Sequence, residues 1–211
     1  ACGVRFPYFS VRRWDGSALS LVKLESLPET APAALAERND EAIRSANAGL
    51  WKDALLAVED AMIAGAAPEG IFGWNAILIR LNGEARKAQA DAAAAPDYPY
   101  PLLARLFYGD YPAAVDVMRG YTAGEIFGQP SALVSGTMAE GWEPTLAGWI
   151  TRTVEPALAV RPQLAEAYFL RAWGNWLANP DDPTVVEDLA RAAELRPDDP
   201  LFTASAALFR E

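Results

Sequence analysis

The sequence contains no histidine and a single cysteine, Cys2. Histidine and cysteine hold most protein-bound zinc, so zinc sites of the usual kind are excluded, as are Ser-His-Asp and Cys-His catalytic systems. Intramolecular disulfides are excluded because they require two cysteines. General acid-base chemistry would have to come from carboxylates, lysine or tyrosine, and no spacing selects an acidic pair. We therefore expect a protein without catalytic residues, metal or cofactor.

Positive charge and long apolar runs are also scarce. Lys and Arg number 18 against 28 Asp and Glu, which gives a net charge of -10. This balance repels phosphate backbones and anionic lipid headgroups, so we expect no nucleic-acid partner. No apolar stretch approaches the roughly 18 to 20 residues that span a bilayer as a helix. Contact with a membrane would then depend on an attached lipid.

Small residues recur at a spacing of 34 in the first half of the chain. The pairs are Ala42 with Ala76, Gly49 with Gly83, Ala54 with Ala88, and Ala61 with Ala95. Such a period is typical of stacked helical repeats, in which small residues lie where two helices approach closely. Together with the apolar periodicity, the spacing predicts helices over 33–48, 51–63, 71–81 and 84–95, with a turn at Asn82-Gly83.

This pattern resembles the tetratricopeptide repeat, a helix-turn-helix unit of about 34 residues. That family places a small residue in its first helix, a glycine and an aromatic at the turn, and a small residue in its second helix. Ala42, Gly49, Trp51 and Ala54 match these positions. Gly109-Asp110-Tyr111 resembles the turn of a third unit, although only 26 residues separate Gly83 from Gly109.

The repeat character returns at the C-terminus. Residues 157–162 are echoed 35 positions later by residues 192–197, which predicts helices over 165–178 and 200–210. Acidic pairs such as Asp181-Asp182 and Asp198-Asp199 are typical of helix starts. The resemblance covers about residues 33–119 and 145–211, and it implies an all-α, TPR-like solenoid of helical hairpins.

The N-terminal segment departs from the helical pattern. Residues 4–24 are rich in Val, Phe, Tyr and Trp, and they centre on Asp15-Gly16, a pair typical of a two-residue hairpin turn. A lone hairpin is marginal in water, so it should dock on the helices or on a partner. An extended arm without a regular hairpin is the alternative. A linker with Pro28 and Pro32 follows, so we expect an arm and linker over 1–32 and a solenoid over 33–211.

Residues 120–148 form the least regular part of the predicted solenoid, with six glycines. The pattern predicts a helix over 131–139 and a loop over 140–144. Long irregular segments serve either as simple connections or as functional elements. An insertion loop and a partner-facing element are therefore both open, with the loop preferred.

In tetratricopeptide arrays the first helix of each pair lines a concave groove that holds peptides or helices. The resemblance assigns this role to Asn39, Asn47, Trp74, Ile77, Arg80, Phe169, Trp173 and Trp176. Because Trp and Arg often anchor interfaces, we expect an aromatic groove for a protein partner. The alternative is that the tryptophans fill space between helices, although Trp173 and Trp176 share a face with little room for both inside. The family's carboxylate clamp needs groove lysines, which are missing here.

Ala1-Cys2-Gly3 fits the end of a bacterial lipobox, where a small residue precedes the lipidated cysteine. A lipid on Cys2 would tether the chain at the bacterial cell envelope, facing the periplasm or the exterior. An incidental cysteine in a cytoplasmic protein is the alternative. We thus expect a non-enzymatic scaffold or accessory subunit that binds a protein partner, such as a larger membrane complex. The alternative function is an envelope lipoprotein that binds a small apolar or sugar-like ligand.

Overall fold

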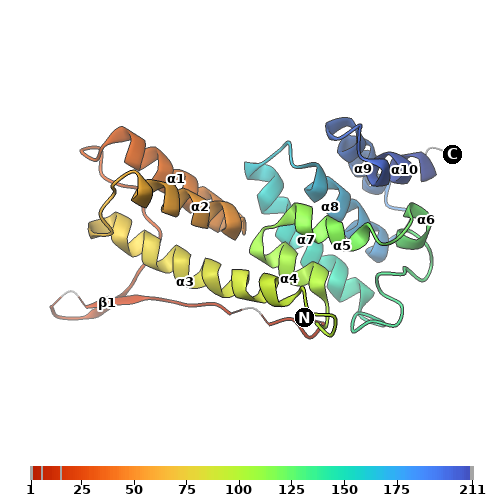
Figure 1. The fold of residues 1–211 in the computed structure, drawn as a ribbon, viewed down its shortest axis with the longest axis horizontal. Coiled ribbons are helices and arrows are strands. Elements are labelled where there is room, and N and C mark those ends of the chain that lie inside the picture. The colour runs from red at the N-terminus through yellow and green to blue at the C-terminus, as the bar shows by residue number, and fades with distance from the viewer. Residues whose placement is uncertain (1, 6, 15, 210–211) are drawn as a thin grey trace.

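The computed structural model describes residues 2–5, 7–14 and 16–209, which form an all-α protein with one short hairpin. The hairpin pairs strands β1 (Arg12–Trp14) and β2 (Leu19–Leu21) in antiparallel fashion. Within the described residues the helices are α1 (Ala33–Asn47), α2 (Trp51–Ile63), α3 (Gly70–Ala92), α4 (Pro101–Tyr108), α5 (Tyr111–Met118), α6 (Ala123–Ile126), α7 (Glu143–Val160), α8 (Ala165–Ala178), α9 (Pro183–Leu195) and α10 (Pro200–Leu208). Most consecutive helices pack on each other along one axis, from α1–α3 at one end to α9–α10 at the other (Figure 1), whereas α6 packs on α10. The predicted fold class is confirmed.

Helix boundaries in the first and last pairs follow the sequence signals. The bounds of α1, α2 and α8 lie within one residue of the predicted ones. Gly49 turns the chain between α1 and α2 with a φ of +75°, a conformation that favours glycine. Asp182 and Asp199 cap α9 and α10, where their carboxylates accept hydrogen bonds from the N–H groups of Thr184 and Leu201 at 2.9 and 3.0 Å.

The second predicted helix pair is instead one long helix. α3 runs unbroken through Asn82 and Gly83, so the predicted turn there is wrong. Gly83 provides space between helices, because a Cβ on it would lie only 2.6 Å from Cγ of Leu55 in α2. The Asn82 side chain donates to the carbonyl of Leu78, one turn earlier, at 3.0 Å. The two residues therefore serve close packing and side-chain bonding rather than a turn.

The glycine-rich segment also differs from the prediction. α6 is a single turn within it, the predicted helix over 131–139 does not form, and α7 already begins inside the predicted loop. Leu133 and Val134 are nonetheless buried. The hydroxyl of Tyr100 donates to the Leu133 carbonyl at 2.8 Å. Glycine disfavours helix here, and burial of the few apolar side chains holds the segment against the helices.

The hairpin forms with a longer connection than predicted. Trp14 pairs with Leu19, so residues 15–18 connect the strands, and the prediction of a two-residue turn is wrong. Gly16 adopts a φ of +102° within this connection. Asp15, the other half of the predicted turn, lies outside the described residues. Four-residue connections are a common alternative to the two-residue turn in hairpins.

Two groups of buried apolar side chains hold the helices together. The smaller group lies mainly between α1, α2 and α3, and five of its nine buried members are alanine. The larger group extends from α4 to α10 and includes the buried rings of Phe169, Trp173 and Phe202. Arg161, after α7, links the two regions through ion pairs with Glu41 of α1 and Asp53 of α2.

Candidate functional site

The N-terminal arm, which we define as residues 2–25, lies along α3 (Figure 1). It starts near the C-terminal end of that helix, where Gly3 lies against Pro99 and Val4 is buried in the larger core. The arm then passes Asn82, forms the hairpin beyond the first turns of α3, and returns to Asn75 before it reaches α1. The arm on both sides of the hairpin is therefore bonded to α3, whereas every residue of the two strands is exposed, so docking of the hairpin itself on the helices or on a partner stays a prediction.

Asn82 holds the arm by its backbone. Its Oδ1 accepts a hydrogen bond from the N–H of Phe9 at 3.0 Å, and its Nδ2 donates to the carbonyl of the same residue at 2.9 Å. Only 1% of Asn82 is exposed, and both ends of its amide are bonded within the protein. The side chain presents a donor and an acceptor as a neighbouring β-strand would. Asn82 therefore binds the backbone of Phe9, and these two hydrogen bonds do not involve the ring.

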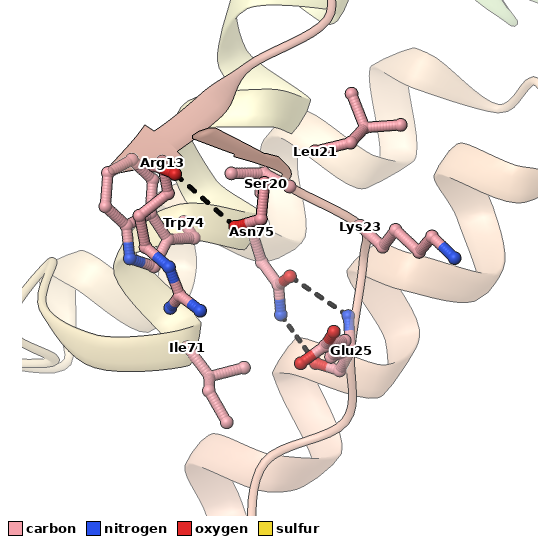
Figure 2. A pocket seen from close by; sticks show the side chains of 9 residues that line it. Arg13, Ser20, Leu21, Lys23, Glu25, Ile71, Trp74 and Asn75 are labelled. Carbon is pink, nitrogen blue, oxygen red and sulfur yellow. Dashed lines mark hydrogen bonds between the residues drawn. The ribbon is translucent and has the colours of Figure 1, made fainter. Parts of the chain in front are cut away.

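Asn75, two helical turns earlier in α3, repeats this arrangement with Glu25 (Figure 2). Its Oδ1 accepts from the N–H of Glu25 at 3.1 Å, and its Nδ2 donates to the Glu25 carbonyl at 2.7 Å. Asn39 of α1 donates to the same carbonyl at 3.2 Å and accepts from Asn75 at 2.8 Å. Both asparagines are as buried as Asn82. We refer to Asn39, Asn75 and Asn82 as the asparagine clamp.

The chemistry of the asparagine clamp selects a conformation rather than a sequence. A buried amide that lacks a partner costs about 1–3 kcal/mol, and all three amides are paired here. Asn75 and Asn82 are seven residues apart, so they share one face of α3 at a separation of about 10.5 Å along its axis. Their bonds to the arm reach only backbone atoms. Proline is excluded at the two clamped positions because it has no N–H to donate.

The hairpin turns one face toward α3 and the other toward solvent. The guanidinium of Arg13 lies 6.0 Å from the ring centroid of Trp74, within the range of a cation–π contact. Beside this pair lies a pocket of about 40 Å³ (Figure 2), which has room for a few water molecules and is far below the size of a ligand site. On the opposite face, Trp14, Leu19 and Leu21 are 61%, 58% and 50% exposed. The hairpin thus presents an unpartnered apolar face.

The arm and the rest of the chain also differ in the sign of their net charge. The arm carries four basic side chains, Arg5, Arg12, Arg13 and Lys23, against the two acidic residues Asp15 and Glu25. Its net charge is +2, so residues 26–211 carry -12 of the total of -10. Opposite net charges attract over several ångströms before any contact forms. The acidic helices therefore favour a basic segment at the asparagine clamp.

The predicted groove residues do not form one surface. Asn39 belongs to the asparagine clamp, and Trp74 contacts Arg13. Ile77 and Arg80 are exposed on α3. Asn47 is exposed at the end of α1, where it lines a separate open cleft of about 280 Å³.

The three aromatic residues predicted on α8 lie in the core. Phe169 and Trp173 are fully buried and Trp176 is 5% exposed. The ring of Phe127 packs edge-on against Phe169 and Trp176 at centroid distances of 5.9 and 5.8 Å. α8 packs on α7 and on α9, which leaves room for both tryptophans inside, contrary to the expectation from sequence. Phe169, Trp173 and Trp176 therefore offer no groove surface in this structure.

Two members of the asparagine clamp were not among the predicted site residues. The Asn82-Gly83 pair predicts a turn when taken alone, and Asn75 lies next to the more conspicuous Trp74. The sequence feature that could have identified them is the recurrence of asparagine at a spacing of seven within an apolar helical stretch. Asparagine is a weak helix former and is seldom buried without a partner. Two such residues on one helix face therefore indicate a bonded neighbour.

Cys2 lies at the far end of the arm from the hairpin. Together with Met138, Trp142 and Trp149 it lines an apolar pocket of about 340 Å³ that is open to solvent. Burial raises the pKa of the Cys2 thiol above its ordinary value. The thiol is therefore protonated at neutral pH, and in this form it is a weak nucleophile.

Neither a membrane span nor a metal site is found in the part of the chain that the structure describes. None of the described helices combines the length and apolar character needed to cross a bilayer. Across the same residues, Cys, Asp and Glu side chains do not gather in groups of three or more that could hold a metal ion.

The fold defines a class: helical proteins of about ten helices packed in sequential pairs. Comparisons with protein-family models, with curated proteins and with solved structures give no significant match to this chain. The tetratricopeptide resemblance therefore remains a hypothesis about the family.

Proposed function

We propose that this protein is a non-enzymatic scaffold that binds a partner protein at the surface formed by the arm and α3. The observation that carries this proposal is the asparagine clamp, which holds the arm by its backbone. The apolar side chains of the hairpin, Trp14, Leu19 and Leu21, stay half or more exposed. Clustered apolar side chains with arginine among them are typical of protein-binding surfaces. The proposal moves the binding surface from the aromatic groove expected along α1, α3 and α8 to the arm and α3.

The double variant Trp14→Ser/Leu19→Ser tests this function. Its matched control is Ile63→Ser, which alters a side chain of α2 that is 84% exposed. Each form is produced in the cells that naturally make the protein, crosslinked and purified. We expect one partner to co-purify with wild type and with the control, and to fall at least about tenfold with the double variant. Equal recovery with the double variant, or no partner with any form, contradicts the proposal.

A tetratricopeptide-like stack and a lipid on Cys2 extend this proposal. The sequential packing of α1 with α2 and of α7 with α8 supports the stack, and the tripeptide Ala1-Cys2-Gly3 supports the lipid. A tether at Cys2 would make the protein an accessory or assembly subunit at the bacterial cell envelope. The intact mass of the natively purified protein tests this: a diacylglycerol-sized increment on an N-terminal Cys2 supports the tether, and a free thiol contradicts it.

The pocket beside Cys2 favours a second candidate function, the binding of a small apolar ligand. Its volume of about 340 Å³ reaches the lower range of ligand sites, which is about 300–1,000 Å³, and Met138, Trp142 and Trp149 line it. The fluorescent probe N-phenylnaphthylamine should then bind at micromolar concentration and lose affinity in Trp142→Ala. An unchanged titration in that variant would remove this candidate.

A further inference from the structure

The asparagine clamp has the properties of a peptide site that is occupied by the protein's own arm. We infer that an extended, basic segment of the partner protein takes the place of residues 7–25 at Asn39, Asn75 and Asn82. This inference rests on the proposed scaffold function, and it adds where the partner binds and what kind of segment it offers.

The asparagine clamp recognises the backbone of the arm alone. Asn82 spans the N–H and C=O of Phe9, and Asn75 spans those of Glu25. Such pairing is that of strand addition, in which main-chain hydrogen bonds supply affinity and do not depend on side chains. Any extended chain without proline at the two clamped positions can make the same bonds.

Release of residues 7–25 exposes only apolar side chains that are already partly exposed. Among the described residues of 7–25, Pro7, Val11, Val22 and Leu24 are partly buried and none is fully buried, and Leu24 packs against the smaller core. Release therefore costs the clamp bonds, the contact between Arg13 and Trp74, and the burial of these four partly buried side chains. Val4 stays buried in the larger core, so residues 7–25 can open as a loop that remains fixed at both ends. The cost of closing such a loop grows slowly with its length.

Each asparagine of the clamp keeps a hydrogen-bond partner after the arm has left. Asn75 keeps its bond to Asn39 at 2.8 Å, and Asn82 keeps its bond to the Leu78 carbonyl at 3.0 Å. The remaining polar atoms become accessible to water once the arm has left, since the arm is what they bond to. The asparagines therefore do not become buried and unpaired, which would cost about 1–3 kcal/mol each.

The net charges of the arm and of the helices indicate which kind of partner segment binds at the asparagine clamp. Residues 26–211 carry a net charge of -12, and the resident arm carries +2, of which residues 7–25 carry +1. A basic segment is attracted to the helices before contact, and an acidic one is repelled. We therefore assign a basic segment, with exposed apolar or aromatic side chains of the kind the arm shows.

The test uses the full chain and a synthetic peptide of residues 7–25 as the probe. Fluorescence anisotropy reports binding of the labelled peptide, and hydrogen exchange of ¹⁵N-labelled protein reports the chain's own Phe9 and Glu25 amides. We expect saturable binding, together with at least tenfold faster exchange of both amides.

A peptide N-methylated at the Phe9 nitrogen, and one with Glu at its three basic positions, should each bind at least tenfold more weakly. Asn82→Ala should weaken binding likewise, whereas Asn47→Ala, the matched control on α1, should not.

Three results overturn the inference. The first is no binding of the peptide at millimolar concentration, and the second is equal binding of the N-methylated peptide. The third is a concentration-dependent dimer of the chain alone in light scattering, which would make a second copy the occupant through exchange of arms. If the peptide does not bind while the Trp14→Ser/Leu19→Ser variant still loses its partner, the inferred site is wrong and the scaffold function is still supported.

Discussion

The helices at the two ends of the molecule are held together by different side chains. α1–α3 pack through alanine and through Gly83, which brings α2 close to α3. α7–α10 pack through aromatic rings, and the centroids of Phe169 and Phe202 lie 4.9 Å apart. An aromatic side chain removes about 150–250 Å² from water, far more than a single methyl group. The C-terminal helices therefore gain more hydrophobic stabilisation from each buried contact.

The buried polar groups also differ between the two ends of the molecule. The N-terminal helices bury three uncharged amides that bond to the arm. The C-terminal half buries Asp188 and Asp199, which pair with Arg171 and Arg119. The first set ties the helices to a segment that can leave, and the second ties helices to each other. The comparison indicates a stable C-terminal base that carries a more easily opened N-terminal site.

The largest expected effect lies in the aromatic core. Phe202→Ala should lower the free energy of unfolding by about 3–5 kcal/mol, because the ring is fully buried and its removal leaves a cavity. Urea unfolding followed by circular dichroism measures this loss. Phe9→Ala serves as the control, since that ring is 43% exposed and should change the value by less than about 1 kcal/mol. Similar losses in both variants would contradict the division between core and arm.

A pair of glycine variants tests the close packing of α2 on α3. Gly83→Ala gains helix propensity but places a Cβ 2.6 Å from Leu55 Cγ, so we expect a net loss of about 1–2 kcal/mol. Gly148→Ala in α7 meets nothing nearer than 3.8 Å and should gain up to about 1 kcal/mol. Thermal unfolding of the two variants should shift in opposite directions. A stabilised Gly83→Ala protein would show that α2 and α3 tolerate more space than the structure gives them.

Asn82→Asp should open the arm without unfolding the C-terminal helices. A carboxylate has no hydrogen to donate to the Phe9 carbonyl and repels it, so about 1–3 kcal/mol of local stability should be lost. Hydrogen exchange of the Phe9 amide should accelerate at least tenfold, while the amides of α7 and α8 keep their rates. The same change at exposed Asn47 is the control. Equal loss of protection in α8 would mean that the arm and the C-terminal base open together.

Sequence alone predicts the helices whose signals are local, and it misses features that depend on distant contacts. The bounds of α2 follow from its apolar periodicity and from Gly49 before it, and the caps Asp182 and Asp199 belong to acidic pairs that are typical of helix starts. Gly83 is an example of such a feature. The local sequence does not distinguish a glycine at a turn from a glycine that lets Leu55 of another helix pack closely. Asn75 is missed for a related reason: its partner, Glu25, is 50 residues away. Trp173 and Trp176 reach the core because α7 and α9 cover α8 on two sides, which no spacing reveals.

The smallest effect, a response to acid, should distinguish the two ends of the molecule. Two hydrogen bonds from the Arg119 guanidinium, at 2.9 and 2.6 Å, hold the pKa of the Asp199 carboxyl below its ordinary value. A lowered pKa in the folded state means that this stabilisation is present above the unfolded pKa of about 3.9 and is lost as the pH falls through the folded pKa. Between pH 5 and pH 3 wild type should therefore lose about 1 kcal/mol more than Asp199→Asn in urea unfolding. The hydrogen bonds between the asparagine clamp and the arm involve only amides and backbone. Protection of the Phe9 amide, corrected for intrinsic exchange, should therefore stay constant down to pH 4. Parallel pH profiles for wild type and Asp199→Asn would contradict the role of this ion pair, and a loss of Phe9 protection between pH 5 and pH 4 would contradict the pH-independence of the clamp.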